Sequence, residues 1–154
     1  MNEYMKEAFK EALKAYKINE VPVGCIIEKD GKIIGRGHNL VEKTNIATRH
    51  AEMIAIEEAC STMGSWRLAG CNMYVTLEPC SMCMGAILHS RINHIHIGAL
   101  DANRGCAISK IPIISEELIP NNSILVIEES DACSYILKRF FKKLRRAKEA
   151  GKNV

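Results

Sequence analysis

The sequence lacks a long apolar run, and this absence excludes a protein that spans a membrane. No stretch of the 154 residues reaches the roughly 18 consecutive apolar positions that a transmembrane helix requires. The start, from Met1 to Glu7, contains acidic residues and no apolar segment, so we expect no signal peptide. Internal repeats, linkers and low-complexity segments are absent too, which favours a single domain over residues 1–154.

The sequence also lacks the even cysteine pattern of a disulfide-stabilised secreted protein. It holds seven cysteines and no export signal, which favours a reducing compartment where thiols stay free or bind metal. We therefore expect a cytoplasmic protein. Cysteines outside any ligand motif are predicted to act as small buried apolar side chains, and these are Cys60, Cys71, Cys106 and Cys133.

A strong charge imbalance is absent from the chain as a whole but present at one end. The net charge is +3, yet from Lys138 onward eight basic residues face the single acid Glu149. A basic helix over about 131–149 can be a solvated face, or it can be an electrostatic footprint for a polyanion such as RNA. The candidates for contacts with an RNA backbone are Lys142, Lys143, Arg145 and Arg146.

The hydrophobic pattern predicts an α/β protein. We expect helices over about 2–17, 50–63, 80–90 and 131–149, and strands over 23–28, 32–37, 73–77, 92–98 and 124–127. Segments 39–49 and 100–122 are rich in turn formers and are expected to be irregular. Strands that alternate with helices indicate a mixed five-stranded sheet covered on both faces, that is, a three-layer α/β/α sandwich.

Some side chains of types that often occur in functional sites are expected to have only a structural role. His94 and His96 share one face of an expected strand, and we predict that both are structural. The last helix has an expected apolar core stripe made of Cys133, Ile136, Leu137, Phe140, Phe141 and Leu144.

Three residues have the types and spacing of ligands in a catalytic zinc site. His50 supplies an imidazole, and Cys80 and Cys83 in Pro-Cys-x-x-Cys supply two thiols. These ligands fill three corners of a zinc tetrahedron and leave the fourth for water, as catalytic sites do. His50 and Cys80 each lie where a helix is expected to begin, and the positive end of a helix favours thiolates. We predict one Zn²⁺ per subunit.

Glu52, two residues after His50, is predicted to carry protons instead of binding the metal. Water bound to zinc can have its pKa lowered to about 7. Glu52 would take the proton of that water, pass it to a ring nitrogen and later protonate the leaving ammonia. His-x-Glu followed by Pro-Cys-x-x-Cys is the known signature of zinc deaminases, in which zinc-bound hydroxide attacks C6 of adenine or C4 of cytosine.

Beyond these motifs, the sequence resembles the bacterial tRNA adenosine deaminases of the TadA type, within the cytidine-deaminase-like superfamily. The resemblance extends from about Glu3 to Lys148. The zinc motif alone indicates only the superfamily. The tRNA branch is indicated by longer runs, namely Val75 to Cys83, His89 to Ile92, and Phe140-Phe141 with the basic residues that follow.

This resemblance implies conversion of adenosine to inosine at the wobble position of a tRNA anticodon, principally in an arginine tRNA. It implies a homodimer in which both subunits contact the RNA. It also implies that Asn39 hydrogen-bonds the flipped nucleotide, that Ala51 offers its backbone N–H to the base, and that Asp101 lies beside the anticodon ribose. Arg139 and Phe141 would meet the nucleotide next to the target.

Two other functional classes stay open on the sequence. A deaminase of a free base or nucleotide, with guanine as the leading candidate, would use the same zinc chemistry, but a neutral small molecule gains little from a basic helix. A non-enzymatic, zinc-stabilised RNA-binding module would keep the ligands, but Glu52 would have no task in it. Turnover assays with tRNA and with free bases separate these classes.

Overall fold

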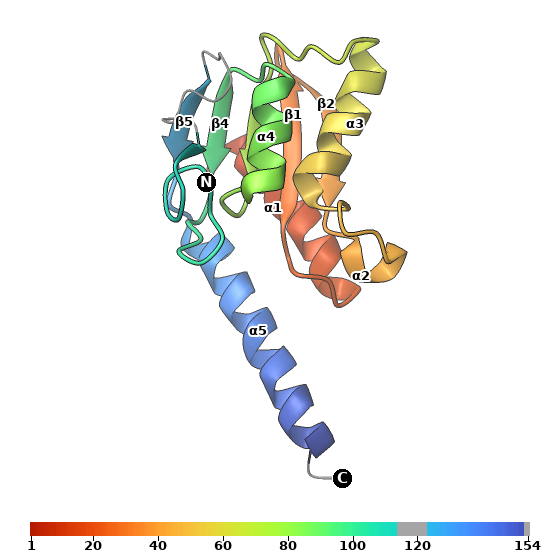
Figure 1. Cartoon of the computed structure of the whole chain (residues 1–154), viewed down its shortest axis with the longest axis vertical. Coiled ribbons are helices and arrows are strands. Elements are labelled where there is room, and N and C mark those ends of the chain that lie inside the picture. The colour runs from red at the N-terminus through yellow and green to blue at the C-terminus, as the bar shows by residue number, and fades with distance from the viewer. Residues whose placement is uncertain (114–122, 153–154) are drawn as a thin grey trace.

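The computed structural model describes residues 1–113 and 123–152. Its five strands form one sheet in the order β2-β1-β3-β4-β5 (Figure 1). Their bounds are β1 Gly24–Lys29, β2 Lys32–His38, β3 Asn72–Val75, β4 His94–Ile97 and β5 Ile124–Ile127. Strand β1 pairs antiparallel with β2 and β3, whereas β3, β4 and β5 run parallel. The mixed five-stranded sheet expected from the sequence is confirmed.

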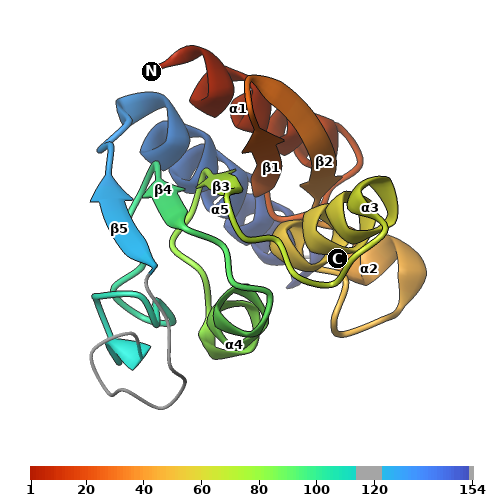
Figure 2. The ribbon, with the colours of Figure 1, turned by 90° about the horizontal axis from the view of Figure 1, so that it is seen from above.

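Helices cover both faces of this sheet, as expected for an α/β/α sandwich. Figure 2 shows α3 and α4 on one face and α1 and α5 on the other. The bounds are α1 Glu3–Lys17, α2 Val41–Thr44, α3 Ala51–Met63, α4 Ser81–His89 and α5 Asp131–Lys152. No helix within the described ranges has the length and apolar character needed to cross a membrane.

The short helix α2 lies in a segment that was expected to be irregular, and that expectation was wrong. The side chain of Glu20 explains it, because this buried carboxylate accepts a hydrogen bond from the Lys43 N–H at 2.6 Å. The contact joins residues that are 23 positions apart, so local sequence does not indicate it. The other segment, 100–122, is mainly turns as far as Lys110, and its last part lies outside the described residues.

The central strands are buried on both faces because helices cover the sheet twice. Ile95 and Ile97 of β4 are fully buried, while His94 and His96 lie half-buried on the opposite face. His94 Nδ1 lies 3.0 Å from the side-chain oxygen of Asn72, and His96 Nδ1 lies 2.8 Å from a Glu128 oxygen. Both histidines thus have partners in or directly after a neighbouring strand, which suits the structural role predicted for them.

Close packing of α3 on β2 brings two loop ends to one edge of the sheet. A Cβ atom on Gly37 would lie 2.3 Å from the Ala51 carbonyl oxygen, so only glycine permits this approach. The Leu40 N–H donates to the Arg49 carbonyl at 3.0 Å and closes the intervening loop. The segment just after β2 and the start of α3 therefore meet at the edge where β3 also ends.

The buried apolar side chains of helix α5 lie in its first half. Cys133, Ile136, Leu137 and Phe140 are buried, as the predicted core stripe requires. The prediction that Phe141 and Leu144 belong to this buried stripe was wrong, because each is 40% exposed. Every residue from 141 to 151 is exposed, and the helix extends beyond the sheet edge at which α3 and α4 begin (Figure 1).

Glu11 ties α1 to the end of β2. Its buried carboxylate lies 2.9 Å from His38 Nδ1 and 2.7 Å from Lys14 Nζ, and Arg36 Nη1 approaches to 3.7 Å. Burial alone would raise the pKa of Glu11, but hydrogen bonds with His38 and Lys14 lower it to about 2. The ionised carboxylate therefore stabilises the junction between α1 and β2.

We predict that Glu11→Gln lowers the free energy of unfolding at neutral pH by at most about 3 kcal/mol. Because the folded pKa lies below the ordinary value of 4.5, this contribution is present above pH 4.5 and is lost as the pH falls toward 2. The difference between variant and wild type in urea unfolding should shrink over that range. Glu3→Gln, an exposed site on the same helix, is the control, and a difference independent of pH would contradict the assignment.

Candidate active site

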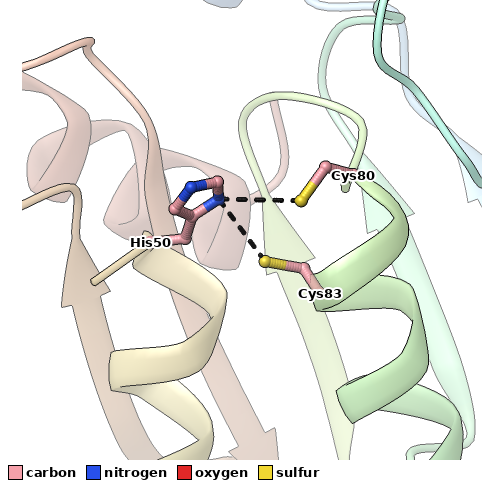
Figure 3. A group of neighbouring side chains, drawn as sticks. All are labelled: His50, Cys80 and Cys83. Atoms are coloured by element: carbon pink, nitrogen blue, oxygen red, sulfur yellow. Dashed lines mark hydrogen bonds between the residues drawn. The ribbon is translucent and has the colours of Figure 1, made fainter. Parts of the chain in front are cut away.

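The three predicted ligands meet at the edge of the sheet where α3 and α4 begin (Figure 3). His50 immediately precedes α3, Cys80 immediately precedes α4, and Cys83 lies in the first turn of α4. His50 Nδ1 lies 3.7 Å from the Cys80 sulfur and 3.6 Å from the Cys83 sulfur. Within the described ranges, this is the one group of at least three His, Cys, Asp or Glu side chains whose ligand atoms all lie within 4.8 Å of one another.

These distances fit a shared zinc ion. Zinc–sulfur bonds of about 2.3 Å and zinc–nitrogen bonds of about 2.0 Å in a tetrahedron place sulfur and nitrogen about 3.5 Å apart. The separations from His50 Nδ1 to the two sulfurs, 3.7 and 3.6 Å, are close to this value. One imidazole and two thiols also form a donor set that zinc prefers, and they leave a fourth position open.

The electrostatics of the cluster favour a thiolate at Cys80. Interactions with the Cys83 side chain and, against the effect of burial, with His50 lower the pKa of Cys80 to about 3. The hydrogen bond with Cys80 raises the pKa of His50, and the imidazole is therefore stabilised in its charged form. Metal binding requires a neutral imidazole and thiolates, so protons leave the cluster when an ion binds.

Glu52 lies next to this cluster in the first turn of α3. Its side chain is buried, with 3% of its surface exposed, and one oxygen accepts a hydrogen bond from the Cys83 sulfur at 2.9 Å. Burial raises the pKa of Glu52. A carboxylate with a raised pKa is suited to accepting and returning a proton near neutral pH. The position agrees with the proton-carrying role predicted for Glu52.

Asn39 and Ala51 lie on the segments that flank the cluster. Asn39 directly follows β2, and its side-chain oxygen accepts the Val41 N–H at 3.3 Å. Ala51 is the first residue of α3, so its N–H has no acceptor within the helix. Both residues are therefore placed beside the ligands, and their contacts with a nucleotide stay predictions.

Asp101 has a local task in the structure. One oxygen of its carboxylate accepts the N–H groups of Asn103 and Arg104, at 3.0 and 3.1 Å, and so closes a turn. The contact with an anticodon ribose expected for Asp101 stays a prediction.

Two of the expected RNA contacts on α5 form hydrogen bonds with α1 or the turn that follows it. Arg139 Nε donates to the Tyr16 hydroxyl at 3.3 Å, and Lys143 Nζ donates to the Asn19 side chain at 3.3 Å. Phe141 is partly exposed and packs edge-on against Phe140, with ring centroids 5.4 Å apart. The basic side chains of Arg139, Lys142, Lys143, Arg145 and Arg146 are all exposed.

Sequence reasoning missed Glu78, a buried carboxylate two residues before Cys80. Its side chain binds the loop after β4 through residues Asp101, Ile108 and Ser109. The position of Glu78, a charged residue between a buried strand and a proline, was the one signal that its side chain binds another part of the protein. The partners lie more than 20 positions away, so no spacing rule identifies them.

The chain has relatives that cover almost its full length. The family model of the cytidine and deoxycytidylate deaminase zinc-binding region matches residues 1–99. The tRNA-specific adenosine deaminase of Bacillus subtilis is 43% identical over 152 residues, which cover 97% of this chain and 93% of that protein. That of Aquifex aeolicus is 43% identical over 142 residues, which cover 92% of this chain and 94% of that protein.

Solved structures share the fold. One from studies of A-to-I editing by tRNA:A34 deaminases at the wobble position of transfer RNA has a TM-score of 0.82 and 34% identity, and the match covers 89% of this chain and 100% of that one. The guanine deaminase of Bacillus subtilis has a TM-score of 0.63 and 34% identity, and the match covers 77% of each chain.

The fold, the ligand cluster and the family match together define a zinc-binding deaminase of the cytidine and deoxycytidylate deaminase class. Within this class, the similarity over nearly the full length shows that the chain belongs to the family of tRNA-specific adenosine deaminases. The resemblance stated from the sequence is thereby confirmed.

We predict that the purified protein contains one zinc ion per chain and that Cys83→Ser removes it. A serine hydroxyl is a poor ligand for zinc compared with a thiolate, so metal content by atomic emission should fall to near zero and the melting temperature should drop. Cys60→Ser changes a thiol outside the cluster and is the matched control. Full zinc content in Cys83→Ser would show that the cluster is misassigned.

Proposed function

We propose that this chain hydrolytically deaminates adenosine to inosine at the wobble position of a tRNA anticodon. The observation that carries the proposal is the ligand cluster of His50, Cys80 and Cys83 with buried Glu52 beside it, in a chain similar to tRNA-specific adenosine deaminases over nearly its full length. The cluster indicates the reaction, and the full-length similarity indicates the substrate.

Glu52 performs the proton transfers in this proposal. The chemistry that zinc supplies in such sites is the activation of a water molecule, whose pKa it lowers to about 7. Glu52 accepts the proton from that water and delivers it to a ring nitrogen of adenine. After the water oxygen has bonded to C6, Glu52 takes the remaining proton of that oxygen and transfers it to the amine, so that the C6–N bond breaks, ammonia leaves and a C6 carbonyl forms. Water and adenosine thus become inosine and ammonia, and Glu52 returns to its starting state.

Residues at the same sheet edge hold the base in place. Asn39 offers a side-chain amide next to the ligands, and Ala51 offers the unpaired N–H of a helix start. Such groups recognise the polar edge of an extruded base. An anticodon loop is already single-stranded, so its bases reach the zinc with a smaller unstacking cost than bases in a duplex.

The exposed half of α5 forms the surface for the RNA backbone. Its basic side chains repel one another, and an isolated helix of this length is marginal in water, so a polyanion would stabilise it. Phe141 is 40% exposed on the same half and supplies an aromatic face on which a neighbouring base can stack. Asp101 and Arg139 lie on the loop and the helix that would flank the bound nucleotide.

The assembly follows from the same proposal. We propose a cytoplasmic homodimer with one zinc ion in each subunit, acting on the anticodon stem-loop of an arginine tRNA. The seven free thiols fit a reducing compartment, and a projecting basic helix leaves room for RNA that contacts both subunits. Light scattering coupled to gel filtration measures the assembly, and editing of tRNA transcripts that differ in anticodon measures the choice of tRNA.

A free-base guanine deaminase is the second candidate. The similarity to the guanine deaminase of Bacillus subtilis favours it, since the zinc chemistry of the two reactions is the same. That similarity covers 77% of the chain, whereas the similarity to the tRNA-specific enzyme of the same organism covers 97%. Incubation with tRNA and separately with guanine, adenine and cytosine decides between them. Rapid guanine turnover with unchanged tRNA would overturn the proposal.

We predict that Glu52→Gln keeps its zinc and loses at least about 100-fold in the rate of inosine formation. The amide has the size of the carboxylate but cannot accept a proton. Single-turnover editing of tRNA and metal analysis measure the two effects. Glu58→Gln, an exposed change on the same helix, is the control. Loss of zinc together with activity would instead assign Glu52 to the metal.

We predict that neutral glutamines at Lys142, Lys143, Arg145 and Arg146 weaken tRNA binding. The slope of log affinity against log salt should become shallower by about 0.7 to 0.9 for each phosphate contact removed. The control replaces four lysines near the opposite sheet edge, Lys6, Lys10, Lys29 and Lys32, so that the net charge changes equally. Equal slopes for the two variants would make α5 a solvated face.

A further inference from the structure

Glu78 has no part in the reaction described above, yet its carboxylate is nearly saturated with hydrogen bonds. One oxygen accepts the N–H groups of Ile108 and Ser109, at 2.7 and 2.8 Å. The other accepts the Asp101 N–H at 2.9 Å and the Ser109 hydroxyl at 2.5 Å. Only 3% of the residue is exposed. A loop that supplies four donors to one buried anion is folded around that anion.

The neighbouring glycine shows how tightly the loop encloses this carboxylate. A Cβ atom at Gly105 would lie 2.3 Å from the Glu78 carboxyl carbon and 2.5 Å from the Asp101 carbonyl oxygen. No side chain fits in that space. Although burial alone would raise the pKa of Glu78, the hydrogen bonds from the loop lower it. The carboxylate is therefore ionised at neutral pH and holds the loop as an anion.

The same loop is joined to the segment that carries the zinc ligand. Cys106 N–H donates to the Pro79 carbonyl at 2.8 Å, and Glu78 N–H donates to the Ala99 carbonyl at 2.8 Å. Cys80 follows Pro79 directly. The chain from Ala99 to Cys106 therefore contacts Glu78 and Pro79, the two residues before Cys80, so a displacement of the loop would act on the backbone next to this ligand.

Between Asp101 and Ser109 the loop carries a single basic side chain, that of Arg104. The backbone of Arg104 is held by Asp101, whose own N–H is bound to Glu78. Arg104 is exposed, so it can contact an anionic group of a substrate bound there. Glu78 thus controls the backbone from which Arg104 extends.

We propose that Glu78 is a positioning residue, which holds loop 101–109 beside Cys80 so that Asp101 and Arg104 meet the nucleotides of a bound RNA. The inference rests on the proposed function, because it assigns the loop to substrate affinity. Glu78 contacts neither substrate nor metal. Its effect on catalysis passes through the loop, so it changes binding of the polynucleotide more than the bond-breaking step.

The test compares Glu78→Gln with wild type in steady-state editing of tRNA. The glutamine side chain keeps one oxygen acceptor but replaces the other oxygen with an NH₂ group. That group faces hydrogen-bond donors of the loop, so the hydrogen bonds of one carboxylate oxygen are lost. KM for tRNA should rise about tenfold or more while kcat changes by less than about threefold, with zinc content unchanged. Amide exchange at Asp101, Ile108 and Ser109 should accelerate.

Glu28→Gln is the matched control. Glu28 is also buried and accepts the Gly31 N–H and the Asn72 side-chain N–H, but it lies at the opposite end of β1 from the ligands. It should lose stability without a change in KM. Ser109→Ala removes one donor and should raise KM in the same direction by a smaller factor, which keeps the test decisive if Glu78→Gln does not fold.

Arg104→Gln tests whether Glu78 acts through the charge of Arg104. If Glu78 acts through Arg104, the double variant should raise KM by less than the product of the two single effects. Loss of kcat at unchanged KM, loss of zinc in Glu78→Gln, or an equal KM shift in Glu28→Gln would each overturn the proposal. Failure of the wild type to edit tRNA would instead overturn the proposed function, so the two failures are distinguishable.

Discussion

The structure depends on two helix starts that meet at one edge of the sheet without capping side chains. The N-cap positions of α3 and α4 are His50 and Cys80, and neither side chain caps its helix. A Ser or Asp in such a position would contribute about 1 kcal/mol to the helix. Here the side chains point at each other, and the free N–H groups of both helices give a positive potential that favours thiolates. A zinc ion held by His50, Cys80 and Cys83 would offset the lost caps and join the two helices.

The two helix starts could be predicted because the residues that determine them are neighbours in the sequence. Alternating and helical periods gave the five strands and the four long helices. The ligand residues could be identified because zinc chemistry requires particular side chains at particular spacings, and the structure brings His50, Cys80 and Cys83 together. The glycine-dependent packing of α3 on β2 was not predicted, although it sets the position of His50.

What could not be predicted depends on single contacts between distant residues. Glu11 reaches His38, Glu20 reaches Lys43, and Glu78 reaches a loop more than 20 positions away. Each is a buried carboxylate, and each binds an irregular segment or a strand end to the body of the protein. The exposure of Phe141 and Leu144 was missed for a related reason, since a helical period shows which face is apolar but not where the supporting surface ends.

The choice of substrate must therefore come from outside the zinc cluster. A guanine deaminase of the same fold is 34% identical to this chain, so the shared fold cannot by itself distinguish a free base from a nucleotide within RNA. The features that can do so are peripheral: the exposed basic half of α5, and loop 101–109, which is folded around Glu78 beside Cys80. Both adjoin the edge at which the ligands lie, and both would add contacts beyond the reacting base. A polynucleotide gains affinity from such contacts, whereas a free base is too small to reach them.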